Sequence, residues 1–365
     1  MHLKELRLRD FRNYTALDAV FQPGFHLFLG DNGQGKSNLL EAIYLLSTLK
    51  SFRGVPNSQL VRAGQKGYFV GGVLVGEREN HVKTYWSARE RNLVLNGRRI
   101  ARTEDIYGTI RAVVFCAEDM LLIKGGPQYR RRYMDFLLAQ TDSAYLTILQ
   151  RYGLALRSRN AALKTGKISA GVLEGFSREL VACGTEIIRR RSDLVQIIRP
   201  TVCLTYEKIA NQKCEEVQCY YRPNVEGDFS VELAQSRQRE LAQRYTVVGP
   251  HRDDLDFLMN GVPVLKQGSE GQKRTWALAL KMAQAEYLTQ VHGVLPVLLI
   301  DDVMGELDQH RRQAFLPLLS RVASGRGQMF MTCTSKNWSQ ELDFKMTEWS
   351  IQRGQLFPSR RESSP

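Results

Sequence analysis

Apolar and polar positions alternate along much of the first 125 residues, which is the pattern of half-buried β-strands. Apolar residues between Leu3 and Phe11 mark an entry strand, and the run FHLFLG predicts a second strand at residues 25–30. The dipeptide Asn96-Gly97 in NLVLNGRRI is typical of a two-residue hairpin turn. The amino-terminal part of the chain is therefore expected to be rich in strands.

Helical spacing replaces this alternation in two regions. The run GKSNLLEAIYLLSTLK has leucine and isoleucine close to helical spacing and no internal proline or glycine, so a helix is expected directly after a glycine turn. From about residue 127 to 213 the apolar stripes are helical, and a long helix after Gly171 is expected to stop before Pro200. A helical region is thus inserted into a strand-rich one.

After about residue 244 strands and helices mix again. DLDFLMNGVPVLK predicts a second Asn-Gly hairpin, GQKRTWALALKMAQAEYL a helix, and PVLLIDD an apolar strand that ends in two aspartates. HRRQAFLPLL and QMFMTCT predict one more helix and one more strand. These patterns predict an α/β protein with a discontinuous domain at 1–125 and 245–357, a mainly helical lobe at 126–244 and a disordered tail at 358–365.

Composition limits the class of protein. The chain has 365 residues, 43% of them hydrophobic, which is enough to fill a substantial core. Its apolar runs are far shorter than the roughly 20 residues of a membrane-spanning helix, and its first residues lack the apolar core of a secretion signal. A cytoplasmic location without a membrane partner is expected. Six cysteines without CxxC spacing favour buried thiols over a zinc site or disulfides.

The net charge of +13 is unevenly distributed. Between Lys124 and Pro200 there are 14 lysine or arginine residues and 6 acidic ones, so about +8 lies in a fifth of the chain. This concentration favours a polyanionic partner such as DNA, although single basic runs are usually solvated helix faces. The candidate DNA contacts are the two triplets Arg130, Arg131, Arg132 and Arg189, Arg190, Arg191.

Residues 30–37, GDNGQGKS, match the phosphate-loop pattern G-x-x-x-x-G-K-[ST] between a strand and a helix. The glycines allow backbone N–H groups to face the β-phosphate, while Lys36 can reach the β- and γ-phosphates and Ser37 can bind Mg²⁺. An ATP site is therefore expected, in preference to a turn that only caps a helix. Its residues are Gly30, Asp31, Asn32, Gly33, Gln34, Gly35, Lys36, Ser37 and Asn38.

Two further segments fit an ATPase. Asp301, at the end of the strand VLLID, can share the Mg²⁺ with Ser37, and Asp302 can orient or deprotonate the attacking water, so Lys36, Asp301 and Asp302 are the candidate catalytic residues. In QGSEGQKRT, Ser269 and Gln272 can form a capping box. With Gly271, they also fit the Ser-x-Gly-Gln signature of ATP-binding-cassette (ABC) ATPases.

Longer stretches resemble the RecF family of bacterial recombination-repair proteins. They begin with LRDFRNYTALDAVFQPGFHLFLGDNGQGKSNLLEAIYLLSTLKSFR and continue with AEDMLLIKGGPQYRRRYMD, VVGPHRDDLDFLMNG, SEGQKRTWALALKMAQAE and LLIDDVMGELD. The resemblance covers nearly the whole chain, and GPHRDD at 249–254 is its most distinctive part. It implies an ABC-type ATPase head, similar to the heads of Rad50 and SMC proteins, that carries the helical lobe as an insertion.

The resemblance also implies a function. RecF-like proteins bind ATP, dimerise on it, bind DNA at junctions of single and double strands, and help RecO and RecR load the RecA recombinase at gaps. Ser269 and Gly271 of a second chain would close each ATP site, and hydrolysis would be weak and stimulated by DNA. Association with the nucleoid follows. Another SMC- or Rad50-like ATPase of DNA metabolism is the alternative, and a transporter ATPase is disfavoured by the basic insertion.

Some further positions match the family pattern, and others depart from it. Arg12 and Asn13 match the family's FRNY and are expected near the nucleotide. Glu118 and Asp119 match a stretch that couples nucleotide to the helical region, although Ala117 replaces the usual proline. Arg53 in SFRG can be interpreted as a phosphate contact or, equally, as a solvated arginine. The other departures are Glu270 in the signature and Met304-Gly305 before ELD.

Overall fold

The computed structural model describes seven segments of the chain: 1–76, 78–100, 111–165, 170–210, 216–323, 327–334 and 346–358, with the side chains of 170 and 320–323 left out. The predicted tail at 358–365 therefore lies outside the described residues except for Pro358, which ends the last strand. Cys214 also lies outside them. The other five cysteines are free thiols, and four of these are buried as expected.

The described chain forms two compact units. Unit 1 comprises Met1–Asp119, Thr205–Lys213 and Leu278–Pro365, and unit 2 comprises Met120–Leu204 and Cys214–Ala277. Two long helices, α5 (Ala170–Ala210) and α9 (Glu270–His292), contribute residues to both units. The boundaries expected from the sequence differ from this division, because they assign residues 245–277 to the ATPase head. Those domain boundaries stay a prediction.

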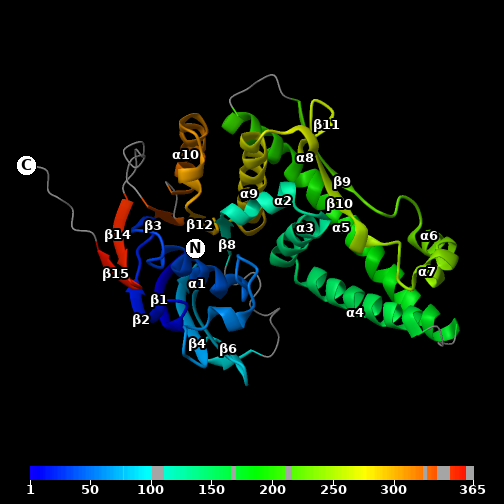
Figure 1. Ribbon diagram of the computed structural model, residues 1–365, viewed down its shortest axis with the longest axis horizontal. Helices are drawn as coiled ribbons and strands as arrows, with labels where there is room; N and C mark the ends of the chain where they lie inside the picture. Colours follow the sequence, from blue (N-terminus) through cyan, green and yellow to red (C-terminus); the bar gives the residue numbers. More distant parts are fainter. Residues whose placement is uncertain are drawn as a thin grey trace, which may run out of the picture. The chain divides into compact units, whose positions relative to one another are not determined.

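Unit 1 contains two six-stranded sheets (Figure 1). The first is antiparallel, in the order β2-β1-β4-β5-β6-β7, and the second is parallel except for its edge strand β15, in the order β15-β14-β3-β13-β12-β8. The strands of the first sheet are β1 (His2–Phe11), β2 (Tyr14–Val20), β4 (Gly67–Val75), β5 (Glu79–Ser87), β6 (Arg91–Leu95) and β7 (Arg98–Arg99). Those of the second are β3 (Gly24–Leu29), β8 (Ala112–Phe115), β12 (Val297–Asp301), β13 (Gln328–Cys333), β14 (Met346–Gln352) and β15 (Gln355–Pro358).

Helix α1 (Lys36–Thr48) packs against strands of both sheets, and this contact forms the core of unit 1. Leu39, Leu40 and Leu46 are fully buried among leucines of β1 and residues of β12 and β13 such as Leu299 and Phe330. Burial of this apolar area fixes the start of α1 next to the ends of β3 and β12. The remaining elements of unit 1 are η1 (Asn57–Leu60), η5 (Val303–Glu306) and α10 (Gln309–Ala323).

Unit 2 is mainly helical. Helix α4 lies beside α5 (Figure 1), and the ion pair of Arg151 with Glu179 joins the two helices at 2.7 Å. The other helices of unit 2 are α2 (Leu121–Lys124), α3 (Pro127–Thr141), α4 (Ser143–Thr165), α6 (Phe229–Gln235), α7 (Arg237–Gln243), α8 (Val264–Gln267) and η4 (Pro250–Arg252), and η3 (Ala117–Met120) lies at the unit boundary. Its sheet has the order β11 (Val262–Pro263), β10 (Asp254–Met259), β9 (Val217–Arg222).

The expected hairpins are present, and one expected helix end is wrong. Asn96 and Asn260 both have positive φ and are followed by glycines with positive φ, as two-residue turns of this type require. Helix α5 does not stop before Pro200 but continues to Ala210, so it is 41 residues long with Pro200 inside it. Pro200 is exposed, and apolar residues on both sides of it, Ile198 and Val202, are buried. Tertiary packing therefore outweighs the local cost of the proline.

Candidate nucleotide-binding site

The phosphate loop connects β3 to α1, as the sequence predicts. Gly35 precedes α1 with φ 113°, and a Cβ atom there would lie 2.6 Å from Nδ2 of Asn13, so only glycine fits. The Lys36 ammonium donates hydrogen bonds to the carbonyl oxygens of Gly30 at 2.6 Å and Asp31 at 2.9 Å. The lysine thus lies across its own loop, where phosphate oxygens can replace the two carbonyls.

The start of α1 and the end of β12, which are distant in sequence, meet at the candidate metal-binding position. The Ser37 hydroxyl lies beside the Asp301 carboxylate at the end of β12, close enough to lower the pKa of that carboxyl. Thr332 of β13 donates to Asp301 Oδ1 at 3.0 Å and accepts from the backbone N–H of Asp302 at 3.0 Å. A hydroxyl and a carboxylate in contact are a suitable pair of oxygen ligands for Mg²⁺, which takes its other oxygens from phosphates and water.

The charges around this position depend on burial. Burial raises the pKa of the Asp301 carboxyl, while hydrogen bonds from Ser37 and Thr332 oppose this effect. The pKa of Asp302 is also raised by burial, with the Lys36 ammonium opposing it. Asp302 has φ 55°, an unusual conformation for a residue that is not glycine and one common at functional sites. The described residues hold no cluster of three or more acidic, histidine or cysteine side chains suited to a metal, so the fit for Mg²⁺ rests on Ser37, Asp301 and the nucleotide.

Asn13 supports the loop directly. Its Nδ2 donates to the Gln34 carbonyl at 2.9 Å and its Oδ1 accepts from Asn38 at 2.9 Å. Tyr14 adds a hydrogen bond to the Gly35 carbonyl at 2.9 Å. The turn after β1 therefore holds both ends of the phosphate loop.

Arg12 makes its side-chain hydrogen bonds to α1 and η1. Its guanidinium makes two hydrogen bonds to the buried Glu41 carboxylate of α1, at 2.7 and 2.9 Å, and a third to the Gln59 carbonyl. Ser51 also donates to Glu41. Arg12 thus holds the turn after β1 against α1, and it holds Asn13 in place.

Arg53 joins the same site. It donates to Asn38 Oδ1 at 3.2 Å, and its guanidinium lies 3.8 Å from Asp301. This position places a positive charge beside the Asp301 carboxylate, the candidate Mg²⁺ ligand, and Arg53 remains a predicted phosphate contact.

Sequence reasoning missed the turn between β14 and β15. The backbone N–H of Arg353 donates to Gln34 Oε1 at 2.7 Å, and that of Gly354 donates to the Gln34 carbonyl at 3.0 Å. Gly354 has φ 74°, and a Cβ there would lie 2.8 Å from the Asn13 carbonyl. The only sequence signal was the dipeptide Arg353-Gly354 between two apolar runs, which predicts a turn but not its contact with residue 34.

The signature segment lies in unit 2 and begins α9. Ser269 accepts a hydrogen bond from the Gln272 N–H at 3.2 Å, and Gln272 Oε1 accepts from the Ser269 N–H at 2.8 Å, so the capping box is present. Gly271 lies within its first turn. The Ser269 oxygen serves as acceptor, which leaves its O–H available to donate to a phosphate. Glu270 forms an ion pair with Lys124 of α2.

Asp119 holds the end of β8 rather than facing solvent. Its Oδ2 accepts from the Cys116 N–H at 2.9 Å, and its Oδ1 lies 3.5 Å from Lys281 of α9. Burial raises the pKa of Asp119, and Lys281 opposes this. Glu118 is half-buried beside it.

The arginine triplets are largely engaged with carboxylates. Arg130 is buried and pairs with Asp254, and Arg191 is buried and pairs with Asp135 and Asp253, at 2.6 to 3.0 Å. The half-buried Arg131 and Arg190 bond to the Asp253 carbonyl and to Asp142 and Glu186. The exposed Arg189 pairs with Glu186 and Asp193, and Arg132 is exposed. Buried, paired guanidinium groups do not present charge to DNA, so Arg132 and Arg189 are the triplet members at the surface.

Comparisons with known proteins place these motifs in one family. The profile of the RecF/RecN/SMC N terminal domain matches residues 2–353. The DNA replication and repair protein RecF of Natranaerobius thermophilus is 37% identical over 368 residues, which cover 94% of each protein. RecF of Lactococcus lactis subsp. cremoris (strain MG1363) is 35% identical, with 97% of this chain and 99% of that protein covered.

Comparison with solved structures agrees with this family assignment. The structure of the recombination mediator protein RecF-ATP in the RecFOR pathway is 32% identical over 98% of both chains, with a TM-score of 0.89. The Smc head domain of Pyrococcus furiosus is 18% identical with a TM-score of 0.57, covers 97% of this chain and 95% of that one, and shows the fold alone. The expected ABC-type head fold is confirmed. In the described residues, no helix combines the length and apolar content needed to cross a bilayer.

Proposed function

This chain belongs to the RecF family of DNA replication and repair proteins, whose fold is the ABC- and SMC-like ATPase head, and on that premise we propose that it is an ATP-dependent DNA-binding protein of recombinational repair. The observation that carries the proposal is the contact of Ser37 with Asp301 beside Lys36. These groups are the ones that bind a nucleoside triphosphate and its Mg²⁺ in phosphate-loop ATPases.

The proposed cycle needs two chains. The phosphate loop, Asp301 and Asp302 of one chain bind ATP, and Ser269, Gly271 and Gln272 of a second chain close the site over the γ-phosphate. ATP then favours the dimer because it binds the closed state more tightly than the open one. Bound Mg²⁺ supplies charge neutralisation at the phosphates, while Asp302 orients the attacking water. Weak hydrolysis, stimulated by DNA, returns the dimer to single chains.

DNA is the proposed partner on which the dimer acts. The concentration of positive charge in residues 124–200 and the family membership both support binding to DNA, at the junctions of single and double strands found at gaps. Loading of RecA together with RecO and RecR, at the nucleoid in the cytoplasm, completes the proposal. Another SMC- or Rad50-like role is the second candidate, but the likeness to RecF-ATP is much greater than that to the Smc head.

The test is the molecular mass in solution, without nucleotide and with ATP and Mg²⁺. The parent chain should change from monomer to dimer only with ATP. Ser269→Arg should bind ATP as the parent does but stay monomeric, because a long charged side chain would occupy the place of the γ-phosphate contact. Lys66→Arg, at an exposed lysine, is the control. A Ser269→Arg protein that dimerises as well as the parent would contradict the two-chain site.

A further inference from the structure

Arginines in unit 2 differ in whether they face a carboxylate. Arg130 of α3 and Arg189, Arg190 and Arg191 of α5 form ion pairs, as described above. Four others, within residues 237–252, form none with any described residue, and no hydrogen bond of their guanidinium groups is present. They are Arg237, Arg239, Arg244 and Arg252. These four arginines therefore present unpaired positive charge within a short stretch of chain, whereas Arg130, Arg189, Arg190 and Arg191 of the triplets are paired with carboxylates.

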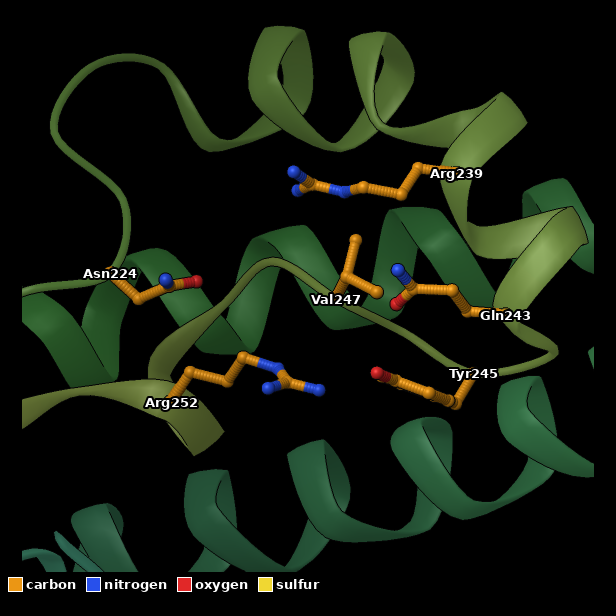
Figure 2. Close-up of a pocket in the computed structure, with 6 residues that line it drawn as sticks. All are labelled: Asn224, Arg239, Gln243, Tyr245, Val247 and Arg252. Atoms are coloured by element: carbon orange, nitrogen blue, oxygen red, sulfur yellow. The ribbon is translucent and has the colours of Figure 1, made fainter.

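Two of these arginines line a pocket in unit 2 (Figure 2). The pocket has a volume of about 310 Å³ and is open to solvent. Arg239 of α7 and Arg252 of η4 extend over it from opposite sides, with Val247 between them. We name it the arginine pocket, and its lining residues are Asn224, Arg239, Gln243, Tyr245, Val247 and Arg252.

The arginine pocket has a rigid base. Next to Arg239 on α7, Glu240 is fully buried and accepts from Arg159 of α4 at 2.5 Å and from the Val247 N–H at 3.1 Å. Arg159 also donates to Thr246 at 2.8 Å. One buried ion pair therefore fixes both α7 and the strand-like segment that forms the floor, so the pocket needs little ordering when a ligand binds.

The polar groups around the rim are also fixed. Asn224 Oδ1 accepts a hydrogen bond from the Gly249 N–H at 2.9 Å, which fixes the position of this side-chain amide at the pocket. Arg252 lies 5.2 Å from the centre of the Tyr245 ring, a cation–π contact that holds the guanidinium in place. The adjacent His251 faces inward to Tyr152 and Thr246, so Arg252 alone of this pair presents charge to the pocket.

From these contacts we propose that the arginine pocket binds a backbone phosphate of a nucleic-acid strand. The inference rests on the proposed DNA binding and assigns it a site. Two guanidinium groups, two side-chain amides and a tyrosine hydroxyl converge on one space, and all of them can donate hydrogen bonds to anionic oxygens. Backbone contacts of this kind give affinity without base specificity.

The surroundings favour a phosphate of a longer polyanion over a single carboxylate. Arg237 and Arg244 continue the positive charge at the two ends of α7, beyond the pocket itself. A strand with a charge on every nucleotide can use these flanking arginines, whereas one carboxylate of a protein partner cannot. The aromatic ring of Tyr245, which is 39% exposed, additionally offers a face for an unpaired base.

The test compares two double variants of the full chain. Arg239→Ala/Arg252→Ala removes both pocket arginines. Arg7→Ala/Arg151→Ala removes the same charge from two arginines that are equally exposed, at 58%, but paired with glutamates. Fluorescein-labelled single-stranded and duplex 30-mers are titrated at several salt concentrations with ATP present, and ATP affinity and solution mass report whether each variant is folded.

We expect the pocket variant to lose about tenfold in DNA affinity and to lower the slope of log affinity against log salt by about 1 to 2, with ATP binding unchanged. The control variant should bind DNA like the parent. A loss confined to the single strand, or to the duplex, identifies which backbone supplies the phosphate.

Other outcomes overturn the inference and separate it from the proposed function. If the pocket and control variants bound DNA equally well, the arginine pocket would not be the DNA site, but the proposed DNA binding of the chain would stand. If the parent chain bound neither the single-stranded nor the duplex 30-mer, both the proposed DNA binding and the proposed pocket site would be wrong. If a labelled hexaglutamate peptide bound the parent and lost affinity in the pocket variant, while DNA binding did not change, the pocket would be a site for an acidic protein segment.

Discussion

At the scale of single residues, the neighbouring carboxylates decide what an arginine can do. Arg191 and Arg252 both belong to stretches that are rich in charge, yet Arg191 is buried between Asp135 and Asp253 whereas Arg252 has no carboxylate partner among the described residues. Removing a partner of the buried arginine leaves an uncompensated charge, which costs about 3 to 5 kcal/mol. Removing the exposed arginine should affect binding and leave folding unchanged.

The pH dependence of stability follows from His251. Burial lowers its pKa from 6.5 to about 4, and the nearby Arg252 and Arg131 add to this effect, while the hydrogen bond with the Thr246 carbonyl opposes it. Between pH 6.5 and 4 the unfolded chain therefore binds a proton that the folded chain does not. The contribution to stability is complete above pH 6.5 and is lost as pH falls toward 4, by about 3 kcal/mol.

His251→Gln tests this, because glutamine keeps a donor and an acceptor but does not titrate. The thermal midpoint of the parent should fall between pH 6.5 and 4, and that of the variant should fall less over the same range. Measurements by circular dichroism at half-unit steps of pH are sufficient. Parallel curves for the two proteins would assign the acid sensitivity to other groups.

Residues with a strong local pattern were predictable, and those defined by distant partners were not. The roles of Gly35, Lys36 and Ser37 could be predicted from the eight consecutive residues 30–37, because the spacing of residues in this motif is enough to form a phosphate loop. The contact of Ser37 with Asp301 was expected from the same logic. In contrast, the ion pairs of Arg130 and Arg191 involve partners 124 and 56 or 62 positions away, and nothing in a run of arginines identifies them.

At the scale of elements, the hairpin of β14 and β15 acts as a support for the phosphate loop. Its turn contributes two backbone hydrogen bonds to Gln34, and the same turn contacts Asn13, which bonds to that residue as well. Loop geometry therefore depends on a strand pair more than 300 positions away in sequence.

Gly354→Ala should weaken ATP binding. The new Cβ would lie 2.8 Å from the Asn13 carbonyl at a backbone angle that alanine adopts with strain, so the turn must move away from Gln34. We expect a lower thermal midpoint, from a loss of about 1 to 2 kcal/mol, and ATP affinity reduced about tenfold. Gly261→Ala, in a turn with the same sign of φ and no close neighbour, is the control in a fluorescent ATP titration. Equal losses in both variants would show strain alone, without a role of the hairpin at the loop.

Helices and hairpins differ in how well their sequences predict them. Both Asn-Gly turns are local, and both are present. The end of α5 was mispredicted because a proline's local cost of about 3 kcal/mol is smaller than the packing of the apolar face that continues through it. The length of α5 is thus a property of its tertiary contacts.

At the scale of the whole molecule, the proposed ATP site uses two segments of different units, the phosphate loop in unit 1 and the signature in unit 2. If the second chain supplies the signature, two defective chains can complement each other. Lys36→Met should abolish ATP binding, and Ser269→Arg should abolish dimerisation. A mixed dimer holds one site with both defects and one site with neither.

Mixing the two inactive variants should therefore restore part of the ATPase activity, while each variant at the same total concentration stays inactive. Phosphate release is the measurement, and a chain carrying both substitutions, mixed with Lys36→Met, is the control that should not recover. No recovery in the first mixture would show that each chain completes its own site.

The buried pair of Arg159 and Glu240 has a consequence for how this sequence can diverge. Both side chains are almost completely enclosed, and each is the other's charge partner. A protein in which only one of them is replaced has an unpaired charge in its interior. That single replacement destabilises the fold far more than replacing both residues does. The two positions should therefore change together or not at all, and α7 with its neighbouring arginines should be inherited as a block.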